Sequence, residues 1–121
     1  MDRYDGRSLG DTPHIVVLGS CKIGNFVVTV PLLRCLRRKY PKGKIDFWGS
    51  EVTKDFEEAL MGCKVNNSSK IIDWRISWDS HDTNTFRTLA SEAVKRGRPD
   101  LLINCDGFNP VTKCLASWLR P

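Results

Sequence analysis

The chain has 121 residues, of which 40% are apolar and 27% charged, and these values are ordinary for one soluble globular domain. Lys and Arg interrupt every apolar run before it reaches the roughly 18 to 20 residues that cross a bilayer, and residues 1–13 carry charges and turn formers where a signal peptide would be apolar. We therefore expect a cytoplasmic protein with a flexible N-terminal arm at residues 1–13 and a single β/α domain at residues 14–121.

The net charge of +5 is concentrated near the end of the first predicted helix, and the rest of the chain is nearly neutral. Cations at a helix C-terminus complement the helix dipole, which is one interpretation. The alternative is attraction to phosphate-bearing lipid or glycan at an anionic membrane surface, here the inner face of the membrane. No signature of a known nucleic-acid module is present in the sequence, so we do not expect nucleic acid as a partner. The basic residues are Arg34, Arg37, Arg38, Lys39, Lys42 and Lys44.

Five cysteines are scattered along the chain without the C-x-x-C spacing of zinc and redox sites, and we expect them to be reduced. Cys35, Cys105 and Cys114 fall in apolar patterns, where a free thiol packs as a small hydrophobe. Cys21 follows the first strand and is the one thiol placed to react, although no partner His is in view.

The first predicted strand is the apolar run H-I-V-V-L at residues 14–18, which Gly19 closes. A helix follows as far as Tyr40, and Asn25 is placed to cap its first turn. Pro31 should kink this helix or mark a shift in its start. The expected core-facing stripe consists of Phe26, Val30, Leu33, Leu36 and Tyr40.

The later elements alternate in the same way. They are expected as strand, helix, strand, helix, strand and helix at residues 44–48, 53–61, 70–74, 83–96, 101–105 and 109–119. Inward positions of the helix at 83–96 are expected to be Phe86, Leu89, Ala90 and either Ala93 or Val94.

One aperiodic stretch, W-R-I-S-W-D-S-H-D-T-N, separates the third strand from the third helix. Trp74 and Trp78 are expected to cover the sheet edge, with stacking on a sugar as the alternative. Asp79, His81 and Asp82 form a weak metal signal that turn and capping chemistry explains, so we expect no metal site.

Regular β/α alternation predicts an α/β fold, with a Rossmann-like parallel sheet of about four strands and helices on both faces. A strand order of 3-2-1-4 would put the topological switch point between the first and fourth strands. Ligands should then bind across two loops, Gly19 to Asn25 and Asp106 to Asn109.

The stretch I-V-V-L-G-S-C-K-I-G-N-F-V-V-T-V-P-L-L-R-C-L-R-R-K-Y-P-K-G-K-I-D-F resembles the opening of the family 9 glycosyltransferases, the heptosyltransferases of lipopolysaccharide synthesis and their relatives. Further on, R-P-D-L-L-I-N-C-D-G resembles a second motif of that family more loosely. The matching positions in the first stretch are Ile23, Gly24, Thr29, Pro31, Leu32, Leu33, Leu36, Tyr40, Pro41, Ile45, Asp46 and Phe47.

The resemblance implies the incomplete N-terminal, acceptor-binding half of a GT-B fold. It further implies transfer of a sugar from a nucleotide-sugar donor to a lipid-linked or cell-envelope glycan, with the donor held by a C-terminal domain beyond these residues. No cofactor is implied. The acceptor would contact Ser20, Lys22, Gly24, Asp106 and Gly107.

Asn25 stands where the family has the aspartate that acts as general base, and Asn104 stands where the second motif has Asp. A carboxamide cannot take up a proton near neutral pH, although it can hydrogen-bond a sugar. The alternative function is therefore a noncatalytic binding or assembly module of the same fold. A generic nucleotide-binding domain is a weaker alternative, because the loop lacks G-x-G-x-x-G.

Overall fold

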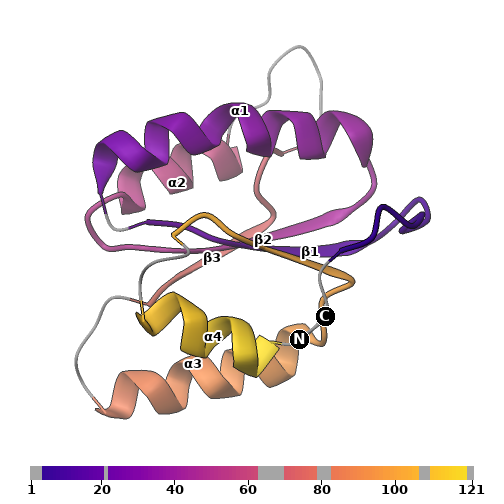
Figure 1. Ribbon diagram of the computed structural model, residues 1–121. Coiled ribbons are helices and arrows are strands. Elements are labelled where there is room, and N and C mark those ends of the chain that lie inside the picture. Colours follow the sequence, from indigo (N-terminus) through magenta and orange to yellow (C-terminus); the bar gives the residue numbers. More distant parts are fainter. Residues whose placement is uncertain (1–3, 21, 63–69, 79–82, 107–109, 120–121) are drawn as a thin grey trace.

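The computed structural model describes residues 4–20, 22–62, 70–78, 83–106 and 110–119, and it is a three-layer α/β sandwich (Figure 1). Helices α1 and α2 cover one face of the sheet, and α3 and α4 cover the other (Figure 1). The elements in chain order are β1 (His14–Leu18), α1 (Ile23–Lys39), β2 (Lys44–Gly49), α2 (Lys54–Gly62), β3 (Trp74–Ser77), α3 (Thr83–Arg96), β4 (Leu101–Asn104) and α4 (Pro110–Leu119).

The four strands form one sheet in the order β3-β2-β1-β4, and every neighbouring pair is parallel. β1 lies in the middle, with Val17 opposite Phe47 of β2 and Ile103 of β4. The predicted Rossmann-like α/β fold and its strand order are confirmed. The switch point lies between β1 and β4, because the chain leaves β1 toward β2 and returns to its other side.

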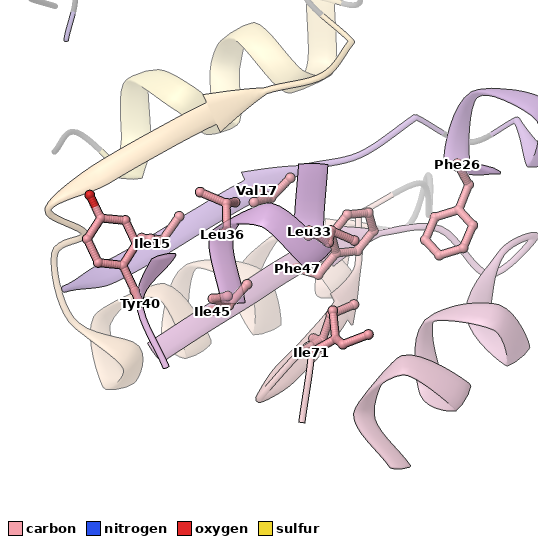
Figure 2. Close-up of a cluster of buried hydrophobic side chains, with 10 residues drawn as sticks. Ile15, Val17, Phe26, Leu33, Leu36, Tyr40, Ile45, Phe47 and Ile71 are labelled. Atoms are coloured by element: carbon pink, nitrogen blue, oxygen red, sulfur yellow. The ribbon is translucent and has the colours of Figure 1, made fainter. Parts of the chain in front are cut away.

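The core has two parts, one on each face of the sheet, because successive residues of a strand point to opposite faces. On the α1 side, Figure 2 shows Leu33 and Leu36 packed over Phe47 and Ile45 of β2. The predicted stripe on α1 is confirmed, since four of its residues are buried and Val30 packs against them partly exposed.

The opposite face holds the tryptophans of the core that the structure describes. Trp48 of β2 packs edge-on against Trp74, with ring centroids 6.1 Å apart, and Leu89 of α3 and Leu115 of α4 cover this side. Ala93 lies against this cluster while Val94 is 82% exposed, which decides between the two alternatives for α3.

The third strand was predicted too early in the chain. Ile71 and Ile72 are buried, but they precede β3, and both backbone N–H groups donate to the carbonyl of Leu60 in α2. Burial of this pair under α2 explains the apolar pattern there. The ladder to β2 starts at Trp74, within the stretch that has no clear period.

The start of α1 also differs from the prediction. The helix begins at Ile23 with Lys22 as its N-cap residue, and no side chain caps it. Asn25 is already the third helical residue, so it is not the cap. Pro31 lies inside the helix, which continues to Lys39.

The predicted basic patch is smaller than the sequence indicates. Arg37 is 7% exposed and donates to Asp73 and to the carbonyls of Gly43 and Ile71. Lys44 is half-buried and donates to the carbonyl of Arg96. The basic residues of this patch that remain exposed are Arg34, Arg38, Lys39 and Lys42.

Two of the cysteine predictions are wrong. Cys35 and Cys114 are exposed on the outer sides of α1 and α4, and neither packs as a core residue. Cys105 is half-buried against the α1 side of the core, and burial raises the pKa of its thiol. Cys21 lies outside the described residues.

Among the described residues, no helix is long and apolar enough to cross a membrane.

Candidate functional site

The carboxyl ends of β1 and β4 lie side by side at the switch point, and we call this edge the candidate crevice because sheets of this kind bind ligands there. The Gly19 N–H donates to the carbonyl of Trp48, and the Cys105 N–H donates to the carbonyl of Leu18. These bonds continue the sheet one residue beyond both strands. The polar residues that follow, Ser20 on one side and Asp106 on the other, are therefore held at the switch point.

Ser20 is 3% exposed and acts as the anchor of the β1–α1 loop. Its hydroxyl oxygen accepts hydrogen bonds from the Asn25 amide Nδ2, at 3.1 Å, and from the Lys22 backbone N–H, at 3.3 Å. Asn25 itself is exposed, and so is Lys22. Ser20 therefore positions the first turn of α1, while Asn25 and Lys22 are the side chains that a ligand can reach.

The chemistry of Asn25 follows from this arrangement. With Nδ2 bonded to Ser20, the Oδ1 oxygen is left to accept a hydrogen bond from a ligand hydroxyl or N–H. An amide oxygen orients such a hydroxyl without removing its proton near neutral pH. The backbone N–H groups that begin α1 and the Lys22 ammonium add positive potential at the same point.

Gly24 is exposed in the first turn of α1, and a Cβ there would meet no atom within 4 Å. Space does not require glycine at this position. At Gly19, in contrast, a Cβ would overlap the Phe47 ring, so the chain turns out of β1 over an aromatic floor that only glycine permits.

The β4 side of the crevice carries two polar residues. Asn104 ends β4, and its Oδ1 accepts a hydrogen bond from the Asp106 N–H at 3.0 Å. Both residues are half-buried. Asn104 thus shapes the turn after the strand. Gly107 and Asn109, which were predicted to line the crevice, lie outside the described residues.

Trp78 supports the crevice from below, a role that the sequence did not indicate. It is 3% exposed in the core facing α3 and α4, and its indole N–H donates to the carbonyl of Gly19 at 3.1 Å. Trp78 follows the edge strand β3, and its burial excludes stacking on a sugar. The signal available in the sequence was the apolar pair Ile76 and Trp78, spaced as alternate residues of one strand.

A second polar group at the same edge is closed, in the sense that its charged side chains pair with each other. We call it the β2–β3 polar cluster: Ser50, Thr53, Glu57, Arg75 and Ser77. Glu57 is fully buried and accepts hydrogen bonds from Arg75 Nε at 3.1 Å, from the Ser50 N–H at 3.2 Å and from the Thr53 hydroxyl. Arg75 also donates to the Ser77 hydroxyl at 2.6 Å. Sequence reasoning missed this cluster, although Glu57 shares the inward spacing of Leu60 and Met61 on α2.

The opposite, amino edge of the sheet holds a third polar group. Asp46 is fully buried, 2.7 Å from His14 Nε2, and accepts two hydrogen bonds from the Arg96 guanidinium, which stacks on Trp74. Burial alone would raise the pKa of Asp46, but the bonds from His14 and Arg96 lower that pKa below its ordinary value. Its matched position in the I-D-F motif is therefore a structural one.

Within the described ranges, no group of three or more His, Cys, Asp or Glu side chains is placed to hold a metal ion. Asp79, His81 and Asp82, the weak metal signal of the sequence, lie outside these ranges.

The fold and the crevice define a class: a small Rossmann-like α/β domain with a four-stranded parallel sheet and a switch point lined by polar loops. Comparisons with protein-family models, with curated proteins and with solved structures find no match to this chain.

Proposed function

We propose that this chain binds the glycan acceptor of a sugar transferase similar to the family 9 glycosyltransferases. The observation that carries the proposal is the position of the I-G-N motif. Its Asn25, held by Ser20, lies exposed beside Lys22 at the switch point, where ligands of parallel α/β sheets bind.

The chemistry of the crevice suits a saccharide better than a nucleotide. Asn25 offers an amide oxygen to a sugar hydroxyl, and Lys22 offers a cation to a phosphate or carboxylate on the same glycan. The loop has no glycine-rich phosphate cradle, so the nucleotide-sugar donor is assigned to a separate C-terminal domain. The acceptor class is a lipid-linked or cell-envelope glycan.

The proposal is tested by titrating the isotope-labelled 121-residue chain with soluble acidic oligosaccharides and with lipid-linked ones, while amide shifts are followed by NMR. Shifts should concentrate at residues 19–25 and at Asp106. Asn25→Ala should weaken binding about tenfold, since one hydrogen bond to the ligand is lost. Ser91→Ala, an exposed change on α3, is the control. Absence of binding by every oligosaccharide would refute the proposal.

A second function, a noncatalytic binding module, is favoured by Asn25 itself, because no carboxylate stands at the expected position of the base. Asn25→Asp separates the two. An acid at the third residue of α1 suits the helix dipole and should stabilise the fold by about 0.5 kcal/mol. With a donor-binding domain and a nucleotide sugar supplied, the aspartate should raise the transfer rate. A folded variant that gives no gain supports the noncatalytic module.

A further inference from the structure

The first turns of α1 expose more large apolar side chains than any other element of the described residues. Seven large apolar side chains of the described residues are exposed, and three lie on the first turns of α1: Ile23 at 48%, Val27 at 59% and Val28 at 73%. Phe56 of α2, which is 50% exposed, adjoins them through Phe26, with ring centroids 6.2 Å apart. The clustering indicates a surface that leaves water on binding.

The second half of the same helix is cationic. At 100° per residue, Val27, Pro31, Arg34 and Arg38 fall on one line along the outer side of α1, and all four are exposed. Lys39 and Lys42 extend the positive charge past the helix end. Helix α1 contains no acidic residue, and it forms the outer layer of the molecule (Figure 1). We call the exposed residues of both halves the α1 outer face: Ile23, Val27, Val28, Pro31, Arg34, Arg38, Lys39 and Lys42.

We propose that the α1 outer face docks on the anionic surface of a lipid bilayer. An exposed helix with aliphatic side chains at one end and four cations at the other fits the bilayer surface, where charged headgroups lie above acyl chains. The cations complement anionic lipid, and the aliphatic residues enter the boundary below the headgroups. A nucleic acid would pair its phosphates with the cations, but its bases stack on aromatic side chains, so Val27 and Val28 would make no contact with it.

The boundary of the docking surface follows from charge. Asp55 and Glu58 are exposed on α2, and an anionic bilayer repels them, so contact is limited to α1 and does not spread over α2. Docking in this way presents the start of α1 to the headgroups. The inference is independent of the proposed sugar transfer, since Val27, Val28, Arg34 and Arg38 are not part of the crevice.

The test is sedimentation of the 121-residue chain with vesicles of phosphatidylcholine alone or mixed with phosphatidylglycerol. The chain should bind the anionic vesicles, and high salt should weaken binding. Arg34→Gln with Arg38→Gln should lower the partition coefficient about 25-fold, because each cation contributes about fivefold. The matched control, Arg87→Gln with Lys113→Gln, removes two exposed cations from α3 and α4 on the other side of the sheet and should leave binding unchanged.

Val27→Ser with Val28→Ser tests the apolar half and should lower partitioning about tenfold. Val94→Ser, at the exposed valine of α3, is its control. All these positions are exposed, so the thermal unfolding midpoint should stay that of the parent. The proposal is overturned if the parent does not bind anionic vesicles at low salt. It is also overturned if replacing the two valines does not change vesicle binding, because the surface would then bind polyanions in general. A third outcome that overturns it is a parent chain that forms dimers and does not bind vesicles, with the dimers lost when the valines are replaced.

Discussion

The two halves of the sheet's carboxyl edge hold similar polar groups that differ in how they are paired. At β2 and β3, Glu57 of α2 and Arg75 of β3 neutralise each other with little exposure to water. Beyond β1, Lys22 at the N-cap of α1 and Asn25 in its first turn are exposed, and buried Ser20 anchors both. Burial and pairing therefore distinguish a structural cluster from a candidate binding site. Position at the sheet edge does not distinguish them, because both groups lie there.

Glu57→Gln is expected to have the largest effect and would break the closed half of this comparison. The variant leaves the Arg75 charge partly uncompensated under α2, which should lower the free energy of unfolding by about 3 kcal/mol. Urea unfolding measures the loss. Glu58→Gln, an exposed change on the same helix, should stay within about 0.5 kcal/mol. Equal stability of both variants would mean that the β2–β3 polar cluster is not structural.

Asp46→Asn tests whether the amino edge is closed in the same way, and its expected cost at neutral pH is about 2 kcal/mol. The pKa of Asp46 in the folded chain lies below its ordinary value of 3.8, so its contribution to stability is complete above that pH. This contribution is lost as the pH falls through the lowered pKa.

Thermal unfolding measured over a pH series should therefore show a decline below pH 3.8 that is smaller in Asp46→Asn than in the parent. Asp55→Asn, an exposed change on α2, should keep the parent's decline. If the variant and the parent decline in parallel, Asp46 does not carry this part of the pH dependence.

Trp78→Phe sharpens the comparison from the other side, with the smallest expected effect. The ring stays in the core, but the hydrogen bond to the Gly19 carbonyl is lost, at a cost of about 1 kcal/mol. Amide hydrogen exchange should become faster in the β1–α1 loop and stay unchanged around Glu57. Unchanged exchange at residues 19–25 would show that Trp78 does not support the crevice.

Much of the fold could be predicted from the spacing of apolar residues along the chain, because most strands are apolar runs and each helix buries one apolar stripe. The run at residues 14–18 and the stripe that starts at Phe26 are examples. The β/α alternation indicated a Rossmann-like sheet, and the strand order expected for such a sheet is the one observed. The place of the candidate crevice followed from that order.

Features that depend on partners distant in the chain could not be predicted. The start of β3 was misplaced because Ile71 and Ile72 satisfy their backbone at Leu60 and not in the sheet. Within the candidate site, the support of Gly19 by Trp78 joins residues 59 positions apart. Side-chain periodicity contains no information about either contact.

The contacts of Arg37 have a consequence for how the domain unfolds locally. Its guanidinium joins the last turn of α1 to the Gly43 carbonyl before β2 and, 34 and 36 residues further along, to Ile71 and Asp73 before β3. The first β-α-β unit is therefore completed by a segment that arrives only with the third strand. The end of α1, the start of β2 and the approach to β3 should exchange their amide protons as one cooperative unit, so that this side of the domain unfolds as a whole.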